Sequence, residues 1–201
     1  MMIGIEDLID QTKADVITWR RQLHKYPELS FQEEKTAQFV YDKLCTLKKL
    51  EVSRPTKTSV MARLIGSLPG NVLAIRADMD ALPMQEENSF EFTSQNPGVM
   101  HACGHDAHTA MLLGTATILS QLQDQIQGEV RFIFQHAEEL FPGGSREMIQ
   151  AGAMADVDKI LGLHVMNHIP TGKIGIVYGP AMAASDTFDV TIQGKGGHAS
   201  Q

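Results

Sequence analysis

The sequence predicts an α/β fold in which helices sandwich a mixed or largely parallel sheet. Segments with the helical spacing of apolar residues alternate along the chain with short, nearly continuous apolar runs. Apolar runs of this kind are typical of strands that are buried on both faces. Polar residues directly follow three of these runs, and functional sites in α/β folds gather at strand ends.

Two helices are predicted in the first 50 residues. Apolar residues recur at three- and four-residue steps over residues 5–23, and Pro27 ends that helix. Ser30 followed by Glu33 matches a capping box, which predicts a second helix that extends to about Leu47. We expect the two helices to lie side by side.

Over roughly the next 115 residues, the sequence pattern predicts four strands and two further helices. The strands are 59–65, 72–77, 130–134 and 158–165, with a turn at 66–71, and the helices are 109–122 and 145–150. Small residues, among them Ala110, Gly114 and Ala116, suit the first of these helices to close packing on a sheet. Asp106 is predicted to cap it.

The pattern changes after residue 172. Residues 172–177 and 187–192 alternate apolar and polar, which predicts strands and a crossing into another domain. The last predicted strand runs into a glycine-rich turn and needs partners that the sequence does not supply. We therefore expect a truncated polypeptide.

Composition excludes several classes of protein. The net charge of -7 and the lack of a Lys/Arg block oppose a nucleic-acid partner. No signal-like segment is present, and no apolar run approaches the roughly 20 residues that span a bilayer, so no membrane partner is expected. Two cysteines, Cys45 and Cys103, are too few for a disulfide framework. A cytoplasmic protein with a free thiol is predicted.

Residues 101–108 place one thiol, three imidazoles and one carboxylate in eight positions. Zinc selects imidazole and thiolate, whereas manganese favours carboxylate and imidazole, so a cluster of this composition indicates a metal site. Cys103 and His105 can face one ion because Gly104 between them permits an irregular backbone. The alternatives for Cys103 are a buried core residue or a zinc knuckle, but a knuckle requires a second cysteine pair.

Two further segments end apolar runs and carry the missing ligands, Glu139 and His164. Glu138 then has a different role, because a carboxylate beside the metal can take a proton from water that the ion acidifies to a pKa of about 7. A solvated pair of glutamates is the alternative. These three segments together predict a hydrolytic metal centre.

The roles of several other polar residues stay open. His24 is a cap, a packing residue or a ligand, and Asp78 and Asp80 follow a buried strand as functional groups or as a solvated turn. His101 and His108 cannot both be ligands without crowding, and one would hold another ligand in place.

Six ordered motifs carry a family resemblance over the whole chain. They are His24-x-x-Pro27-Glu28-Leu29-Ser30, Arg76-Ala77-Asp78-Met79-Asp80-Ala81-Leu82-Pro83, His101-Ala102-Cys103-Gly104-His105-Asp106-x-His108-Thr109, Gln135-x-Ala137-Glu138-Glu139, Gly162-Leu163-His164 and Gly194-x-Gly196-Gly197-His198-Ala199. They resemble the metal-dependent amidohydrolases that include hippurate hydrolase, N-acetyldiaminopimelate deacetylase and the auxin-conjugate hydrolases. These are related to aminoacylase and carboxypeptidase G2.

The resemblance implies a zinc-exopeptidase-like catalytic domain with two divalent ions, which could be zinc, manganese, cobalt or nickel. It implies that Cys103 bridges or shares the ions, that His105, Glu139 and His164 are further ligands, that Glu138 is the base, and that Asp80 orients a ligand. Where some relatives have a histidine ligand, this chain has Asp78, to which we assign no such role. A final histidine ligand would lie near the end of a longer chain.

The resemblance also implies two domains. Residues 1–184 would be the N-terminal part of the catalytic domain, and residues 185–201 would begin an inserted α+β lid and dimerisation domain. In that lid and dimerisation domain, His198 would polarise the scissile carbonyl, and in relatives the matching histidine often acts across a dimer interface.

The implied activity is hydrolysis of the amide bond of N-acyl amino acids, and the parent enzyme would be a homodimer or higher homo-oligomer. The truncated chain would be weak or inactive alone. A dipeptidase or aminopeptidase on the same scaffold and a non-catalytic metal-binding remnant are the alternatives.

Overall fold

The computed structural model describes residues 4–184, 186, 188–198 and 200. The chain divides into two units, one that ends at Val165 and one that begins at Met166. All helices and strands found in the described residues belong to the first unit. None of these helices combines the length and apolarity that a membrane crossing requires.

A five-stranded mixed sheet with the order β1-β2-β4-β3-β5 forms the centre of the first unit. The strands are β1 (Leu50–Ser53), β2 (Val60–Ile65), β3 (Leu68–Asp78), β4 (Gln127–Gln135) and β5 (Lys159–Gly162). β2 runs antiparallel to both β1 and β4, whereas β3 runs parallel to both β4 and β5. The predicted mixed sheet is confirmed.

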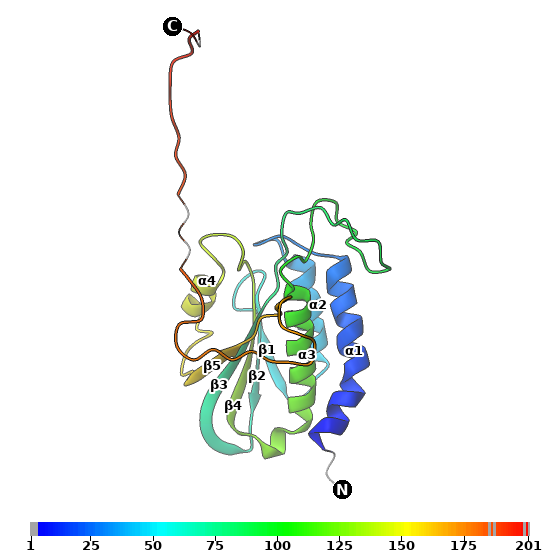
Figure 1. Cartoon of the computed structure of the whole chain (residues 1–201). Coiled ribbons are helices and arrows are strands. Elements are labelled where there is room, and N and C mark those ends of the chain that lie inside the picture. The colour runs from blue at the N-terminus through cyan, green and yellow to red at the C-terminus, as the bar shows by residue number, and fades with distance from the viewer. Residues whose placement is uncertain (1–3, 185, 187, 199, 201) are drawn as a thin grey trace. The chain divides into compact units, whose positions relative to one another are not determined.

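Helices cover both faces of this sheet (Figure 1). They are α1 (Ile5–Lys25), α2 (Glu34–Cys45), α3 (His105–Gln121) and the short α4 (Ser145–Gln150), and a 3-10 turn at Gln123–Gln125 precedes β4. α2 and α3 pack on one face, α1 packs along α3, and α4 lies on the other face. The predicted α/β sandwich is therefore confirmed.

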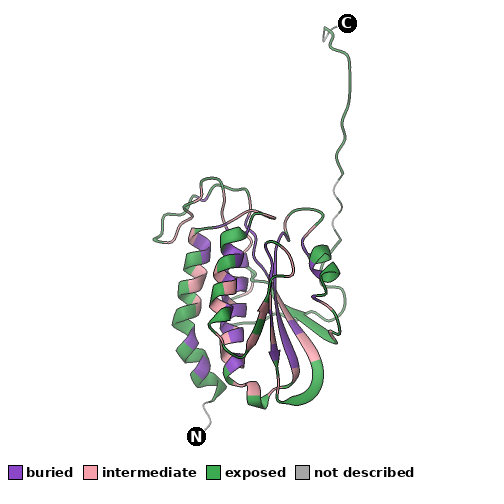
Figure 2. Ribbon diagram, turned by 180° about the vertical axis from the view of Figure 1, so that it is seen from behind, coloured by how far each residue is buried: buried purple, intermediate pink, exposed green. Residues whose placement is uncertain are grey.

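β4 is the central strand and is buried on both faces. Phe132 and Phe134 point into the larger core between the sheet and the helices, and Ile133 points into the smaller core with Met148 of α4. Figure 2 shows buried residues along the inner strands and the inner side of α3, while β5 at the sheet edge is exposed. The apolar run at 130–134 was a reliable signal because such a strand has no solvated face.

Close packing of helices depends on one glycine. A Cβ at Gly114 would lie 2.5 Å from Cγ2 of Val16, so the absence of a side chain lets α1 approach α3. We expected the small residues of this helix to pack on the sheet. Gly114 instead faces α1, whereas Ala116 belongs to the core on the sheet side.

Several local predictions are wrong. β1 was not predicted, because as a partly exposed edge strand it carries few apolar residues. β3 begins at Leu68, inside the predicted turn, with an irregularity before Val72. Ser30 does not cap α2, since Glu33 is the residue that precedes the helix and the Ser30 hydroxyl donates to Asp80 instead (2.6 Å).

The part of the second unit that the structure describes contains no strand, although alternation predicts strands at 172–177 and 187–192. A strand forms only where its backbone groups find hydrogen-bonding partners, which alternation alone cannot provide. Ser185, at the predicted domain boundary, and Thr187, where the second strand would begin, lie outside the described residues. The division at residue 184 stays a prediction.

Candidate metal centre

The candidate site lies where β3, β4 and β5 end and α3 begins. These three strands are parallel, and Asp78 at the end of β3 is in register with Gln135 at the end of β4. Parallel strands place their carboxyl ends at one edge of the sheet, so the polar residues that follow them meet. His105 is the first residue of α3 and adds an imidazole from the helix side.

His105 is fully buried and presents one free ring nitrogen to this edge. Its Nδ1 donates to the carbonyl of Asp80 (2.9 Å), which leaves Nε2 without a hydrogen-bond partner. Nε2 lies 3.6 Å from Oε1 of Glu139 and 3.6 Å from Oδ2 of Asp78. Oε1 of Glu139 is also buried and unpartnered.

Cys103 and His164 lie beside His105. Sγ of Cys103 is 3.3 Å from Nε2 of His164, whose Nδ1 donates to the carbonyl of Val165 (2.7 Å). Two sets of side chains each bring their donor atoms within 4.8 Å of one another, namely Cys103, His105 and His164, and His105, Glu138 and Glu139. All five residues predicted for the centre are therefore together, and their roles stay predictions.

This donor set fits divalent metal ions. Thiolate, imidazole and carboxylate are the ligands of zinc and related ions. The unpartnered Nε2 of His105 and Oε1 of Glu139 are buried polar atoms, which are rare unless something binds them. An ion between them would give both atoms a partner.

The two glutamates differ in exposure and charge environment. The side chain of Glu138 is 42% exposed and that of Glu139 is 22% exposed. Burial and the neighbouring charge of Glu139 raise the pKa of Glu138. Burial, followed by the carboxylates of Glu139 and Glu138, raises the pKa of the Cys103 thiol to about 12 in the protein alone. A bound cation would favour the thiolate.

Asp80 is hydrogen-bonded to several segments of the site. Its Oδ2 accepts the hydroxyl of Ser30 (2.6 Å) and the backbone N–H of Glu139 (2.9 Å). Burial alone would raise the pKa of Asp80, but hydrogen bonds from His105, Ser30 and the turn at 138–139 hold it well below its usual value. The predicted orienting role of Asp80 stays a prediction that this geometry supports.

Glu33 is a site residue that sequence reasoning missed. Its Oε1 accepts the backbone N–H groups of Ala137 (2.7 Å) and Phe31 (3.0 Å), and its side chain is fully buried. Ala137 has a φ of +47°, which is unfavourable for a residue with a side chain. Glu33 thus holds the turn that presents Glu138 and Glu139.

Asp78 and His108 form a second buried pair. Asp78 accepts hydrogen bonds from Arg76 (2.6 Å) and from Nδ1 of His108 (2.6 Å). Nε2 of His108 accepts the backbone N–H of Val165 (3.0 Å). His108 is therefore bonded on both ring nitrogens.

His24 belongs to a separate network. Its ring bridges the carboxylates of Asp106 (2.8 Å) and Glu86 (3.0 Å). Burial would lower the pKa of His24, but these hydrogen bonds outweigh it and raise the pKa. The predicted cap role of Asp106 is wrong, because Gly104 precedes α3 and Asp106 bonds to His24 and Arg20. His24 is a packing residue that ties the loop at 83–100 to α1.

Two other histidines, His101 and His198, lie outside these contacts. His101 is buried without a partner on either ring nitrogen, and burial lowers its pKa to about 4. His198 is exposed in the second unit, where its Nδ1 accepts the hydroxyl of Ser200 (2.7 Å). The role predicted for His198 stays a prediction.

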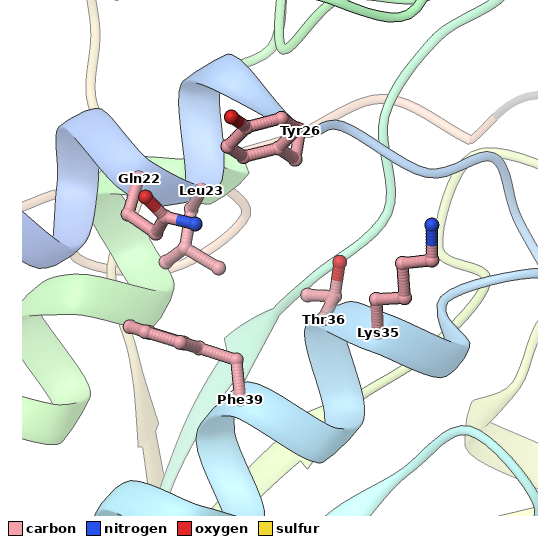
Figure 3. A pocket seen from close by; sticks show the side chains of 6 residues that line it. All are labelled: Gln22, Leu23, Tyr26, Lys35, Thr36 and Phe39. Atoms are coloured by element: carbon pink, nitrogen blue, oxygen red, sulfur yellow. The ribbon is translucent and has the colours of Figure 1, made fainter.

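A cavity of about 290 Å³ lies apart from this chemistry, between the end of α1 and the start of α2 (Figure 3). Its lining residues are Gln22, Leu23, Tyr26, Lys35, Thr36 and Phe39. None is a histidine, a cysteine or a carboxylate. This cavity therefore supplies neither metal ligands nor the general base that hydrolysis needs.

Comparisons with known proteins identify relatives of this chain. The sequence profile of peptidase family M20/M25/M40 matches residues 74–199. The chain is 70% identical to an N-acyl-L-amino acid amidohydrolase of Geobacillus stearothermophilus and 46% identical to thermostable carboxypeptidase 1 of Saccharolobus solfataricus, in each case over 96% of this chain and 52% of the relative. The chain thus spans about half the length of these curated relatives.

The fold of the chain is also similar to that of a solved structure. The chain is similar to a Bacillus subtilis protein described as a dinuclear metal-binding peptidase of the M20 family, with a TM-score of 0.81 and 43% sequence identity. The match covers 85% of this chain and 48% of the solved one.

Proposed function

The chain belongs to peptidase family M20/M25/M40, and on that premise we propose that the whole protein hydrolyses the amide bond of N-acyl amino acids. One observation carries the proposal. The buried, unpartnered Nε2 of His105 faces the unpartnered Oε1 of Glu139 at 3.6 Å, with the more exposed Glu138 next to it. This arrangement separates a ligand site from a base that water and substrate can reach.

Two divalent ions are proposed, and zinc, manganese, cobalt and nickel all suit the ligands. The ligands would be His105, Glu139, His164 and Cys103, with Cys103 shared because it lies near both His164 and the Glu139 carboxylate. When bound, such ions lower the pKa of a water molecule and polarise a carbonyl.

Glu138 would act as the general base. Its side chain is 42% exposed, so water can reach it, and a carboxylate can both accept and return a proton. It would take the proton of the attacking water and deliver it to the nitrogen of the leaving amino acid. Asp80 would hold His105 and the turn before Glu139 in place while this happens.

Further parts of the proposal concern the whole protein. His198 would polarise the scissile carbonyl from the lid and dimerisation domain, which would begin near residue 185. The enzyme would act as a homodimer or higher homo-oligomer in the cytoplasm, on a small-molecule substrate.

A peptidase activity is the second candidate, because one relative at 46% identity is named a carboxypeptidase. Both activities release an amino acid from an amide bond, and they differ in the group on its nitrogen. N-acetyl and N-benzoyl amino acids, dipeptides with a free amine and longer peptides therefore separate an amidohydrolase from a dipeptidase, aminopeptidase or carboxypeptidase.

The test uses the whole protein with each of the four metals and these substrates. We expect Glu138→Gln to lower kcat by about 10²- to 10⁴-fold with metal content unchanged, whereas Glu91→Gln, at an exposed position outside the site, leaves kcat unchanged. Hydrolysis that survives Glu138→Gln would contradict the base assignment. Metal uptake without hydrolysis of any of these substrates would favour a non-catalytic metal-binding protein.

A further inference from the structure

The segment that follows β5 is attached to the start of α3 by two contacts, which we call the Val165 anchor. It consists of Asp78, His108, Gly104 and Val165. We propose that His108 is a positioning residue that sets His164 against Cys103 through this anchor, an inference that rests on the metal centre proposed above.

The first contact depends on the tautomer of His108. The Asp78 carboxylate only accepts hydrogen bonds, so the 2.6 Å contact requires the proton on Nδ1 of His108. Nε2 then has a lone pair and accepts the N–H of Val165 (3.0 Å). Arg76 bonds the other oxygen of Asp78 (2.6 Å), which fixes the orientation of the carboxylate.

In the second contact, the side chain of Val165 packs against the backbone of Gly104. A Cβ at Gly104 would lie 2.3 Å from Cγ2 of Val165, so the Val165 side chain occupies the space that any other residue would fill. Gly104 also has a φ of +91°, which favours glycine. Val165 is thus held through its N–H by His108 and through its side chain by Gly104.

The anchor orients the neighbouring imidazole. The carbonyl of Val165 accepts Nδ1–H of His164 (2.7 Å), so Nε2 of His164 points its lone pair toward Sγ of Cys103 at 3.3 Å. The carbonyl of Val165 is the hydrogen-bond acceptor of Nδ1 of His164 in the described residues. The orientation of this imidazole therefore depends on where the anchor holds Val165.

The alternative role for His108 is that of a metal ligand. Asp78, His105 and His108 also bring donor atoms within 4.8 Å of one another, as metal ligands do. Both ring nitrogens of His108 are already hydrogen-bonded, however, and neither has a lone pair left for a metal. The geometry favours positioning over ligation.

The tautomer can be measured in the metal-free wild-type chain. Long-range proton–nitrogen NMR spectra of the histidines should show His108 protonated on Nδ1 and unprotonated on Nε2. His108 protonated on Nε2 would overturn the anchor. This measurement needs no variant and so does not depend on a substitution that folds.

Variants then test the effect on metal binding. His108→Gln can still accept the Val165 N–H, whereas His108→Ala cannot. We expect His108→Ala to weaken zinc or cobalt affinity about 10- to 100-fold and His108→Gln to weaken it by less than about fivefold, because residues that orient a ligand have effects of this size. Thr115→Ala, which removes only a bond within α3, is the control and should bind as wild type.

The outcomes are distinct. Equal affinity in His108→Ala and wild type would overturn the positioning role. Loss of one bound ion in both His108 variants would overturn it in favour of a ligand role. A whole wild-type protein that binds no ion but shows the expected tautomer would contradict the metal centre while supporting the anchor. Circular dichroism of each variant establishes that it is folded.

Discussion

Glu33 is the residue whose replacement tests the geometry of the site most directly. Its fully buried carboxylate accepts the N–H groups of Ala137 and Phe31, and Ala137 adopts a left-handed backbone conformation one residue before Glu138. In Glu33→Ala both N–H groups lose their acceptor. In Glu33→Gln the amide oxygen can still accept both.

The magnitude follows from these contacts. A buried N–H group that loses its partner costs about 1 to 3 kcal/mol. The N–H of Ala137 is buried and that of Phe31 is half-buried, and removal of the buried charge of Glu33 offsets part of the cost. We expect the free energy of unfolding to fall by about 2 to 4 kcal/mol in Glu33→Ala and by about 1 kcal/mol or less in Glu33→Gln. Gln32→Ala, at an exposed position in the same turn, should change it by less than about 0.5 kcal/mol.

Urea unfolding at neutral pH measures these differences. A Glu33→Gln variant as unstable as Glu33→Ala would refute the reasoning, since the acceptor would then not be the important feature. Glu33→Ala with wild-type stability would refute it as well.

The pH dependence gives an independent test. Burial raises the pKa of Glu33 above its usual 4.5 in the folded protein. Below pH 4.5 the group is protonated in both states, and as the pH rises toward the folded pKa the unfolded chain ionises first. Wild-type stability relative to Glu33→Gln should therefore fall over this interval. A flat difference would contradict the raised pKa.

Three further predictions concern the metal centre and the core. Cys103→Ser should abolish the sulfur-to-metal absorption of the cobalt complex, and a retained band would exclude Cys103 as a ligand. Arg131→Ala leaves Glu129 with Arg63 as its remaining partner and removes the donor to the carbonyls of Ala153 and Ala155, so it should lower the free energy of unfolding by about 2 to 4 kcal/mol. The same change at Arg63, whose side chain is 39% exposed, should cost about 1 kcal/mol or less, and equal effects would contradict this. Leu113→Ala should cost about 2 to 5 kcal/mol in thermal or urea unfolding, and a neutral effect would place Leu113 outside the core.

The fold was predictable wherever burial leaves a periodic signal. The middle of β4 is largely apolar because the strand is central, and α4 was predicted with its observed bounds. β1 was missed because an edge strand has little apolar character. The alternation after residue 172 predicts strands that the described residues do not form, since strand formation depends on partners elsewhere.

The residues that meet at the candidate site were predictable from the sequence, and most of those that support them were not. Cys103, His105, Glu139 and His164 carry metal-binding chemistry that a reader can recognise in the sequence. Ser30, Glu33 and Asp106 were instead interpreted through local helix-capping rules. Their partners lie 50 to 104 residues away in sequence, and no local pattern predicts such contacts.

The exposed edge position of β5 has a dynamic consequence. In the 201-residue chain β5 is an edge strand, and edge strands open locally at a lower free energy than central ones, so we expect the segment that carries His164 to open before β4 does. An ion held by His164 would bind only the attached form and would therefore oppose this fluctuation. Amide hydrogen exchange in β5 of this chain, compared with that in β4, would then report ion occupancy at the sheet edge.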